Sequence, residues 1–408
     1  MNKINVIGLG YIGLPTALMF AANGVKVVGT DLNKNIVSEL NKGRLTFKEE
    51  GLEEVFERAV NLGIEFSTEY IKTDKYIITV PTPYIQESKK IDSSYVISAV
   101  NTVLDVCERG TILVIESTIS PGTIDRFIRP IIEGWGFIIG EDIHLVHAPE
   151  RIIPGKMVYE LINNSRTIGA DDESIGNEVK KWYKSFCNGE IVVTNIKTAE
   201  MSKVVENTFR DINIAFANEL ARICRREDMD VYELIKIANK HPRVNILQPG
   251  PGVGGHCISV DPWFLVGDYP DLVNIILSAR QVNDSMPEFV IDRIRTIMNE
   301  NGITDISRVG LYGLTYKEDV DDMRESPTLQ LMERLERFFV KGIKTYDPCI
   351  DEKKFEGQYM NFEEFINDVE LVVIMVGHSH IKENVQALYN KLVLDTRNII
   401  NEVDVYKL

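Results

Sequence analysis

The chain has 408 residues, enough for two or three domains, and its 44% hydrophobic and 26% charged residues are typical of a globular protein. Its formal net charge of −16 argues against a nucleic-acid partner and against general attraction to anionic lipid, because both favour a basic surface. An anionic small ligand is not excluded, since a few local Arg and Lys side chains can dominate one pocket.

The cysteine and histidine content argues against a disulfide framework and against a metal site. Five cysteines form no CxxC pair, and six histidines form no HExxH motif. An odd number of cysteines in a chain of this size is not the pattern of a disulfide scaffold or a structural zinc site. We therefore expect no metal.

The segment Ile4–Ala22 carries no charge and could be read as a signal peptide or a membrane span. It contains Gly8, Gly10, Gly13 and Pro15, however, and the spacing of these glycines is better explained by a nucleotide-binding turn. We therefore expect no export signal, no membrane attachment and a cytoplasmic location.

Short apolar runs rich in β-branched residues alternate with helical patterns through the first third of the chain. This alternation predicts a mostly parallel sheet covered by helices. The expected strands are Ile4–Ile7, Lys26–Thr30, Tyr76–Val80, Thr111–Ile115 and His144–His147.

A segment without Gly or Pro, Thr198–Arg226, predicts one helix of about eight turns that connects two halves of the chain. From Ser307 the alternation of strands and helices resumes, and VGLYGLTYK loosely resembles the N-terminal VIGLGYIGL without repeating its glycines. We infer a second, smaller doubly wound unit whose nucleotide-binding turn serves another purpose. The fold class is α/β, with expected domains at 1–197, 198–300 and 301–408.

Gly8-Leu9-Gly10-Tyr11-Ile12-Gly13 fits the GxGxxG pattern of dinucleotide-binding turns. It follows an apolar strand, opens a helical pattern and precedes VKVVGTD, which ends in Asp31. All parts of the fingerprint therefore lie within one βαβ unit, and the helix N-terminus would face the pyrophosphate. Because Asp31 would accept hydrogen bonds from the ribose and repel a 2′-phosphate, NAD is favoured over NADP. The alternative is three glycines in an ordinary tight turn.

Two later turns come directly after expected strands and could also line the cofactor site. They are Pro81-Thr82-Pro83 and Glu116-Ser117-Thr118. Ligands of open α/β sheets bind at the carboxyl ends of strands, although each turn by itself could be only a loop.

The segment His241–Phe264 concentrates glycine and proline before Cys257, with Asp261 four residues later. Glycine-rich backbone can fold closely around a ligand and expose a side chain. Cys257 is therefore a candidate nucleophile, whereas a buried cysteine normally acts as a small hydrophobic residue. His256 is adjacent in sequence, and we interpret it as structural rather than catalytic.

On the expected long helix, Lys203, Asn207, Arg210 and Ile214 recur at a spacing that places them on one face. The simple interpretation is a solvated polar stripe. The functional one is that Lys203 stabilises an alkoxide or moves a proton while Asn207 hydrogen-bonds the same oxygen.

These features resemble the UDP-glucose/GDP-mannose dehydrogenase family along essentially the whole chain. The resemblance rests on GLGYIGLP, ESTISPGT, HAPERIIPG, TAEMSKVVENTFRDINIAFANEL, the GGHC loop and LTYKEDVDDMRESP. It implies an NAD domain, a central helical domain that dimerises and a C-terminal UDP-binding domain. Within the family, the loop before Cys257 is most similar to enzymes acting on UDP-N-acetyl-D-mannosamine. UDP-N-acetylglucosamine and UDP-glucose are the alternative substrates.

The resemblance also implies roles for individual residues. Cys257 is the expected nucleophile, Lys203 the acid/base group, and Asn207, Asp261, Thr118 and Glu150 orient the sugar or the water. Arg324 is expected to reach the NAD. The expected UDP-sugar pocket is lined by Arg151, Ile152, Lys203, Asn207, Arg210, His241, Arg243, Gly254, Tyr316, Lys317 and Arg397.

The implied reaction oxidises a primary alcohol to a carboxylate with two NAD per sugar, through a thiohemiacetal and a thioester on Cys257. One alternative is a two-electron β-hydroxyacid dehydrogenase, which would not need the GGHC loop or a second α/β domain. A non-catalytic nucleotide sensor would need the glycine-rich turn but not Cys257, Lys203 and Asp261 together.

Overall fold

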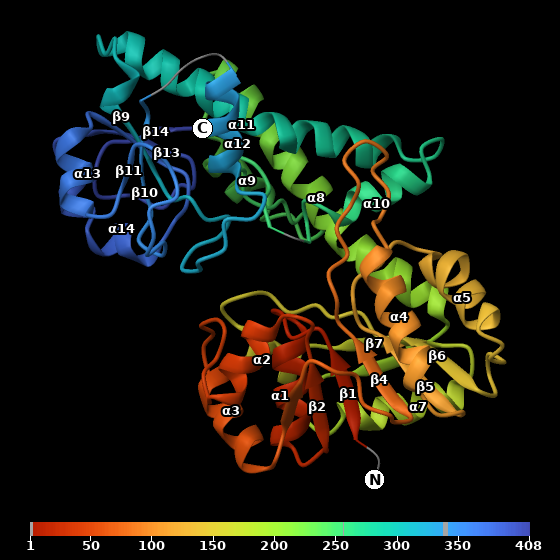
Figure 1. The fold of residues 1–408 in the computed structure, drawn as a ribbon. Coiled ribbons are helices and arrows are strands. Elements are labelled where there is room, and N and C mark those ends of the chain that lie inside the picture. The colour runs from red at the N-terminus through yellow and green to blue at the C-terminus, as the bar shows by residue number, and fades with distance from the viewer. Residues whose placement is uncertain (1–2, 256, 338–341) are drawn as a thin grey trace. The chain divides into compact units, whose positions relative to one another are not determined.

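The computed structural model describes residues 3–255, 257–337 and 342–408. The chain divides into two compact units, residues 1–206 and 207–408, and the boundary falls within one long helix, α8 (Ile196–Arg226). Figure 1 traces the chain from the first unit, in red to yellow, to the second, in green to blue.

The first unit is built on a sheet that, within the described residues, has the order β3-β2-β1-β4-β5-β6-β7-β8. The five strands predicted from the sequence are confirmed with bounds that shift by two residues at most, and β3, β7 and β8 were not predicted. All pairings are parallel except that of β6 with β7. The strands are β1 Ile4–Ile7, β2 Val27–Thr30, β3 Glu65–Ser67, β4 Lys75–Ile78, β5 Thr111–Ile115, β6 Ile143–His147, β7 Arg166–Ala170 and β8 Ile191–Thr194.

The helices of this unit explain the uncharged N-terminal stretch. All ten residues of α1 (Gly13–Ala22) are buried, so its apolar composition serves the core. No helix in the described part of the chain has the length and apolar character needed to cross a membrane. The remaining helices are α2 Lys34–Asn41, α3 Leu52–Asn61, α4 Ser94–Val106, a π-helix Ile124–Ile128, α5 Arg129–Gly134, α6 Met157–Asn163 and α7 Glu173–Tyr183.

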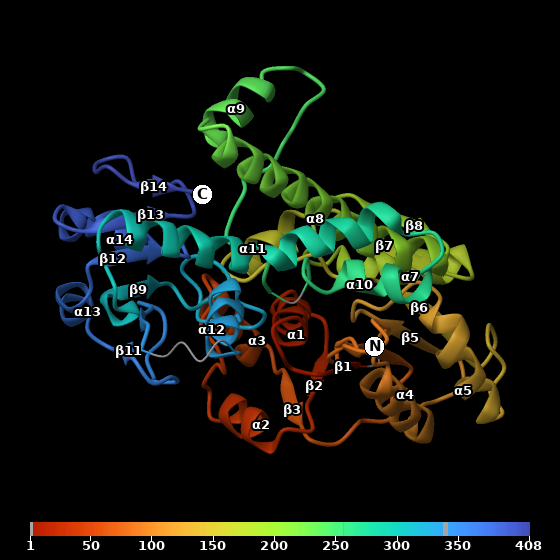
Figure 2. The same cartoon turned by 90° about the horizontal axis from the view of Figure 1, so that it is seen from above.

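Two long helices form the start of the second unit. The predicted long helix is confirmed as α8, and the second long helix is α11 (Asn274–Glu300); both are labelled in Figure 2. A buried polar chain joins them: Asn218 donates to Asn283, and Asn283 and Arg280 both bind Asp211. Shorter helices are α9 Val231–Ala238, α10 Asp261–Asp268 and α12 Pro327–Arg337.

The second sheet confirms the predicted return of the α/β pattern. Among the described residues its strand order is β11-β10-β9-β12-β13-β14, and all pairings are parallel. The strands are β9 Val309–Tyr312, β10 Lys344–Tyr346, β11 Gln358–Tyr359, β12 Leu371–Ile374, β13 Leu392–Asp395 and β14 Tyr406–Lys407. The accompanying helices are α13 Phe362–Asp368 and α14 Ser379–Glu383, with 3-10 turns at Ile306–Arg308 and Val385–Leu388.

The first turn of each sheet has the same construction. Gly8 comes after β1 with φ of +92°, and Gly313 comes after β9 with φ of +96°. The amide of the next residue donates to an aspartate at the end of the neighbouring strand: Leu9 to Asp31 at 2.7 Å, and Leu314 to Asp347 at 2.6 Å. The two glycine turns therefore resemble each other in structure as well as in sequence.

The two turns lead into different structures. In the first sheet α1 begins at Gly13, immediately after the glycine turn, whereas in the second the chain runs through residues 315–326 before α12 begins at Pro327. The second unit therefore has a longer loop where the first unit has a short phosphate-binding turn. This loop after β9 contains the LTYKEDVDDMRESP motif.

Candidate active site

The glycine turn after β1 has the geometry of a dinucleotide site. A Cβ at Gly8 would lie 2.9 Å from the Thr79 carbonyl oxygen, and one at Gly13 would lie 1.8 Å from the Gly8 carbonyl oxygen. A Cβ at Gly10 would meet nothing within 4 Å. Gly8 and Gly13 thus permit close packing of strand and helix, while Gly10 leaves open space beside the start of α1, where a pyrophosphate can approach the backbone.

Asp31 lies at the end of β2, as the fingerprint requires. Its two carboxylate oxygens accept hydrogen bonds from the backbone of Leu9 (2.7 Å) and Asn33 (2.8 Å), which ties it to the glycine turn. Tyr11 in the same turn packs its ring on Phe47 with centroids 4.5 Å apart, and Ile12 is half-buried beside it. The fit of these residues to NAD rests on the open side of Gly10 and on this half-buried carboxylate.

The predicted turns after β4 and β5 lie next to each other. The Thr82 hydroxyl donates to the Thr118 carbonyl at 2.6 Å, and the Ser117 hydroxyl donates to the Val80 carbonyl at 2.7 Å. Because β1 pairs with β2 on one side and β4 on the other, the strand order reverses at β1. These loops therefore rim the switch point at which open α/β sheets bind ligands. Pro81 is exposed at the start of its loop.

Asp31→Asn should weaken NAD binding by roughly tenfold and reduce the preference for NAD over NADP, because it removes a charge-assisted acceptor and the repulsion of a 2′-phosphate. Asn retains an oxygen that can accept from Leu9, so the fold should persist. Steady-state kinetics with both cofactors would measure the change. An unchanged NAD/NADP ratio would contradict the role assigned to Asp31.

Glu150 is buried at the carboxyl end of β6 and is held from two directions. One carboxylate oxygen accepts hydrogen bonds from the backbone of Arg151 (2.6 Å) and Ile152 (3.2 Å), and the other is ion-paired with Arg166. Arg166 also lies 3.3 Å from Glu116, which comes immediately after β5. Arg166 and Glu116 were not singled out from the sequence as partners of Glu150.

The neighbours of Glu150 occupy different environments. Arg151 is ion-paired with Glu206 of α8 through two contacts of 2.6 and 2.7 Å, and Ile152 is buried. Lys203 is buried on α8 with 5% of its surface exposed. Because its amine is removed from bulk solvent, Lys203 fits the expectation of an acid/base group better than that of a solvated polar stripe.

Within the second unit, Cys257 stands at the entrance to α10. It is exposed, and its carbonyl accepts the amide of Asp261, the first residue of the helix, at 2.9 Å. Asn207 on α8 donates to the buried Asp261 carboxylate at 2.6 Å. The structure therefore brings Asn207 of the long helix to Asp261, four residues after Cys257. A thiolate near a helix N-terminus is electrostatically favoured.

The glycines before Cys257 allow its loop to pack on the loop after β9. A Cβ at Gly254 would lie 2.5 Å from the Glu325 carbonyl oxygen, and one at Gly255 would lie 2.7 Å from the Tyr316 ring. The Gly255 amide also donates to the Arg324 carbonyl at 3.1 Å. The LTYKEDVDDMRESP motif thus supports the cysteine loop directly, which the sequence alone did not reveal.

Three asparagines hold the approach to this loop. Asn213 bonds the backbone of Asn245 and Leu247, Asn239 bonds both backbone groups of Ile246, and Asn218 accepts the Gly250 amide at 2.9 Å. Asn213 and Asn218 lie on α8 and Asn239 ends α9, so no local pattern identified them.

Arg397 lies beside Gly250, where a Cβ would be 2.8 Å from its guanidinium. It helps to line a cavity of about 490 Å³ together with Tyr232, Lys236, Asn239, Lys240, Gln248 and Asn398. Three cationic side chains in one cavity suit an anionic ligand. This local charge occurs in spite of the chain's net negative charge.

The other residues predicted to line the UDP-sugar pocket differ in how exposed they are. Arg210 is exposed on α8, whereas Lys203 and Asn207 are buried, so the expected common face is divided between buried and exposed positions. His241 and Arg243 are exposed in the turn after α9, and the Arg243 amide contacts the His241 ring at 3.3 Å. Lys317 is half-buried. His256 lies outside the described residues.

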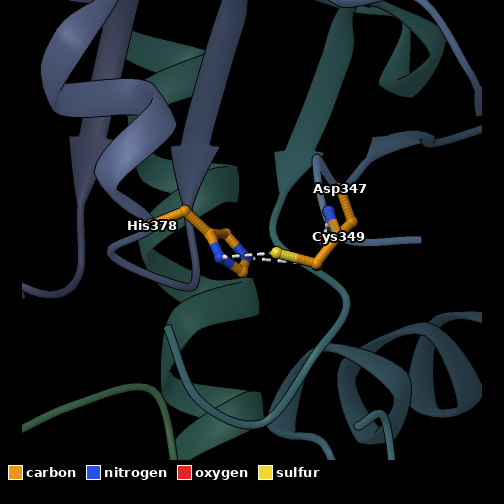
Figure 3. A group of neighbouring side chains, drawn as sticks. All are labelled: Asp347, Cys349 and His378. Atoms are coloured by element: carbon orange, nitrogen blue, oxygen red, sulfur yellow. Dashed lines mark hydrogen bonds and ion pairs between the residues drawn. The ribbon is translucent and has the colours of Figure 1, made fainter. Parts of the chain in front are cut away.

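Asp347, Cys349 and His378 form a group with metal-type ligand atoms within 4.8 Å of one another (Figure 3). Their hydrogen bonds already use these atoms: His378 Nδ1 accepts the Asp319 amide at 3.0 Å, and Nε2 lies 3.2 Å from Asp347. Burial and the neighbouring Asp347 raise the pKa of Cys349 to about 12. The group holds the turn after β9 in place and is not proposed as a metal centre.

Comparison with known protein families accounts for the three parts of the chain in order. The NAD binding domain of the UDP-glucose/GDP-mannose dehydrogenase family matches residues 2–187, its central domain residues 197–285, and its UDP binding domain residues 310–402. The chain belongs to the UDP-glucose/GDP-mannose dehydrogenase family. It is an NAD-dependent nucleotide-sugar dehydrogenase, and the resemblance inferred from its motifs is confirmed.

Relatives within this dehydrogenase family match nearly the full length. UDP-N-acetyl-D-mannosamine dehydrogenase of Methanococcus vannielii is 42% identical over 98% of this chain and 94% of its own. The solved structure of UDP-N-acetyl-mannosamine dehydrogenase from Staphylococcus aureus is 40% identical with a TM-score of 0.89, covering 99% of this chain and 98% of its own. The Pyrococcus horikoshii UDP-D-ManNAc dehydrogenase structure is 36% identical with a TM-score of 0.92 and the same coverage.

Proposed function

We propose that this protein oxidises the C6 alcohol of UDP-N-acetyl-D-mannosamine to the carboxylate with two NAD per sugar. The observation that carries the substrate is the 42% identity to a UDP-N-acetyl-D-mannosamine dehydrogenase over 98% of the chain. The exposed Cys257 lies four residues before the buried Asp261, to which Asn207 donates, and this arrangement supports a covalent four-electron oxidation.

The residues proposed to bind NAD are Gly8, Gly10, Tyr11, Ile12, Gly13, Asp31, Pro81, Thr82, Thr118 and Arg324. Bound NAD supplies the acceptor for one hydride in each of the two oxidations. In bound NAD the glycine turn would place backbone amides beside the pyrophosphate, and Asp31 would hold the adenosine ribose. The proposed domain boundaries remain 1–197, 198–300 and 301–408.

The first oxidation removes a proton and a hydride from the C6 alcohol. We assign the proton to Lys203, directly or through water, and a hydrogen bond to the same oxygen to Asn207. The hydrogen bond from Asn207 to Asp261 orients the amide, leaving its carbonyl oxygen and second N–H for substrate. The product of this step is an aldehyde.

The second oxidation needs a carbon that again carries a hydride to give up. The Cys257 thiolate adds to the aldehyde carbon, and the resulting oxyanion takes up a proton to form a thiohemiacetal. Loss of a hydride and a proton gives a thioester. Water, guided by Glu150 or Asp261, then adds to the thioester carbonyl, releases the carboxylate and regenerates the thiol. Thr118 is proposed to orient the sugar or the water.

Substrate binding is proposed to use both anionic and polar contacts. The residues are Arg151, Ile152, Lys203, Asn207, Arg210, His241, Arg243, Gly254, Tyr316, Lys317 and Arg397. Arg397 lines the cationic cavity of about 490 Å³, whose charge complements a diphosphate.

Side-by-side assays of UDP-N-acetylmannosamine, UDP-N-acetylglucosamine and UDP-glucose test the proposal. We expect two NADH per sugar and the highest kcat/KM with the mannosamine derivative. A preference for either of the other sugars would overturn the substrate assignment while keeping the chemistry. One NADH per sugar would instead favour a two-electron dehydrogenase, and ligand binding without turnover would favour a nucleotide sensor.

We also propose that the chain forms a homodimer through α8. Phe209, Phe216 and Ile223 recur at seven-residue intervals on this helix and are 65%, 49% and 53% exposed. Residues seven apart lie on one helical face, so they form an apolar stripe that a second copy could cover.

Replacing Phe209 and Phe216 by Glu should convert the dimer to a monomer, because it would bury like charges at the centre of the interface. Light scattering coupled to size exclusion would measure the mass. Tyr159→Glu is the matched control, since Tyr159 is 67% exposed on α6, outside the stripe. A monomeric wild type, or a double variant that stays dimeric, would contradict the proposal.

A further inference from the structure

A buried cluster of three charged side chains lies at the ends of β5, β6 and β7. Glu116 is 1% exposed, Glu150 6% and Arg166 5%. Charged groups are rarely buried this deeply unless they are paired, because removing them from water is costly. Their arrangement therefore requires an explanation beyond packing.

The antiparallel direction of β7 brings Arg166 to this place. Val146 pairs with Ala170 and His147 with Gly169, so continuing the register places Arg166 opposite residue 150. In a parallel strand the first residue would lie at the opposite edge of the sheet. The cation therefore reaches the carboxyl edge, where ligands bind, only because β7 runs backwards.

Both carboxylate oxygens of Glu150 are engaged. Oε1 accepts the amides of Arg151 and Ile152, and Oε2 is ion-paired with Arg166 Nη2. Two backbone donors and one ion pair fix the direction of this carboxylate. The remaining lone pairs of these oxygens are the positions from which Glu150 could accept a proton from water.

Arg166 is also ion-paired with a second carboxyl group, that of Glu116, at 3.3 Å. Burial, opposed by the charge of Arg166, raises the pKa of Glu116 to about 8. The Arg166 guanidinium is itself held over the Tyr183 ring at 4.6 Å and the Phe186 ring at 5.5 Å. One cation thus stands between two carboxyl groups, and at neutral pH Glu116 retains its proton.

Among the other titratable groups around the cluster, His147 and Tyr183 are uncharged at neutral pH, and Arg151 is paired with Glu206. Burial lowers the pKa of His147 to about 3, so its ring is neutral. Burial also raises the pKa of Tyr183 well above its ordinary value. Cys187 is buried near Arg166, and Arg151 is engaged by Glu206.

We propose that Arg166 and Glu116 are positioning residues that hold the Glu150 carboxylate in the direction needed by the water that hydrolyses the Cys257 thioester. This inference rests on the proposed function. Arg166 holds Glu150 by an ion pair, and protonated Glu116 leaves the charge of Arg166 undivided. When Glu116 ionises, the two carboxylates share Arg166, and the added negative charge favours transfer of the water proton to Glu150.

The pH dependence results from that sharing. Hydrolysis of the thioester should rise by roughly threefold as the pH passes through about 8, since a stronger base accepts the proton of water more readily. The pKa of Glu116 is raised on folding, so the stability it contributes is complete below about 4.5 and is lost as the pH rises through about 8.

Single-turnover reactions with UDP-N-acetylmannosamine and excess NAD test the proposal, with NADH measured by absorbance and the Cys257 adduct by intact mass. Arg166→Met keeps a long unbranched side chain at this position but removes the cation that holds Glu150. We expect hydrolysis at pH 7 to slow by roughly 10- to 100-fold and the thioester to accumulate. The first NADH should form within about twofold of the wild-type rate, and hydrolysis should recover toward pH 9.

Glu116→Gln is the conservative variant, nearly isosteric and without the titrating proton. Its hydrolysis rate should lack the rise near pH 8, and its Tm relative to that of the wild type should increase from pH 6 to pH 9. Arg129→Met is the matched control, because Arg129 pairs with Asp125 and Asp171 outside the cluster.

Three results would overturn the inference: unchanged hydrolysis in Arg166→Met at pH 7, a defect in that variant that does not depend on pH, or identical pH profiles for Glu116→Gln and wild type. If Arg166→Met fails to fold, the Glu116→Gln profile decides alone. A wild type that forms no Cys257 adduct would instead contradict the proposed function.

Discussion

Cys257→Ser is expected to lower carboxylate formation by a factor on the order of 10³ or more, as loss of a covalent nucleophile does in other enzymes. A hydroxyl at this position is a far weaker nucleophile than a thiolate, so the aldehyde would not be held for the second oxidation. Because Cys257 is exposed at the entrance to α10, its replacement should leave packing unchanged. NADH stoichiometry and intact mass with the UDP-sugar would measure the effect.

Cys107→Ser provides the matched control, because Cys107 is a half-buried thiol at the end of α4 with no assigned role. It should retain full activity. Two NADH per sugar at the normal rate in Cys257→Ser would exclude the covalent mechanism. Normal NAD binding by Cys257→Ser would show that the fold of the first unit is intact.

Gly13→Ala should lower the stability of the fold, whereas Gly10→Ala should weaken NAD binding. A Cβ at Gly13 would lie 1.8 Å from the Gly8 carbonyl oxygen and 2.1 Å from the Thr79 hydroxyl, so the strand and α1 would have to separate. Overpacking of this kind costs about 1–3 kcal/mol or more, which lowers Tm by several degrees. A Cβ at Gly10 meets nothing within 4 Å, so this variant should fold normally.

Gly10→Ala should instead lose NAD affinity by roughly tenfold or more, because the methyl group would occupy the space proposed for the pyrophosphate. Thermal melts without NAD separate the stability effect, and calorimetric titration with NAD separates the binding effect. Gly134→Ala is the control, since its Cβ in α5 also meets nothing within 4 Å. Equal melts for Gly13→Ala and Gly134→Ala, or unchanged NAD affinity in Gly10→Ala, would contradict these roles.

Features with a local cause were predictable from the sequence. Strands β1 and β5 have the predicted bounds because short β-branched runs between turn residues have one stable conformation in a buried sheet. The long helix α8 lacks Gly and Pro, so its period and length were apparent. The nucleotide turn was predictable because Gly8, Gly10, Gly13 and Asp31 lie within one βαβ unit.

Other elements were missed because their pattern is short or mixed. β3 has three residues and none of them is buried, and β7 begins with Arg166 and Thr167, so its apolar part is only three residues long. The expected polar face of α8 is divided: Lys203 and Asn207 are buried, whereas Arg210 is exposed. Helical spacing gives the direction of a side chain but not what covers it.

The sequence by itself determined the NAD turn, the two α/β halves and the long helix, and it singled out Cys257 as the thiol proposed to react. Only the tertiary structure decided which residues support that chemistry. Arg166 meets Glu150 because β7 runs antiparallel to β6, and Asn207 meets Asp261 across 54 positions of sequence. The loop after β9 packs on Gly254 and Gly255 through contacts that are equally distant in sequence. Such contacts depend on strand direction and on how distant segments pack, and neither is encoded in a local pattern.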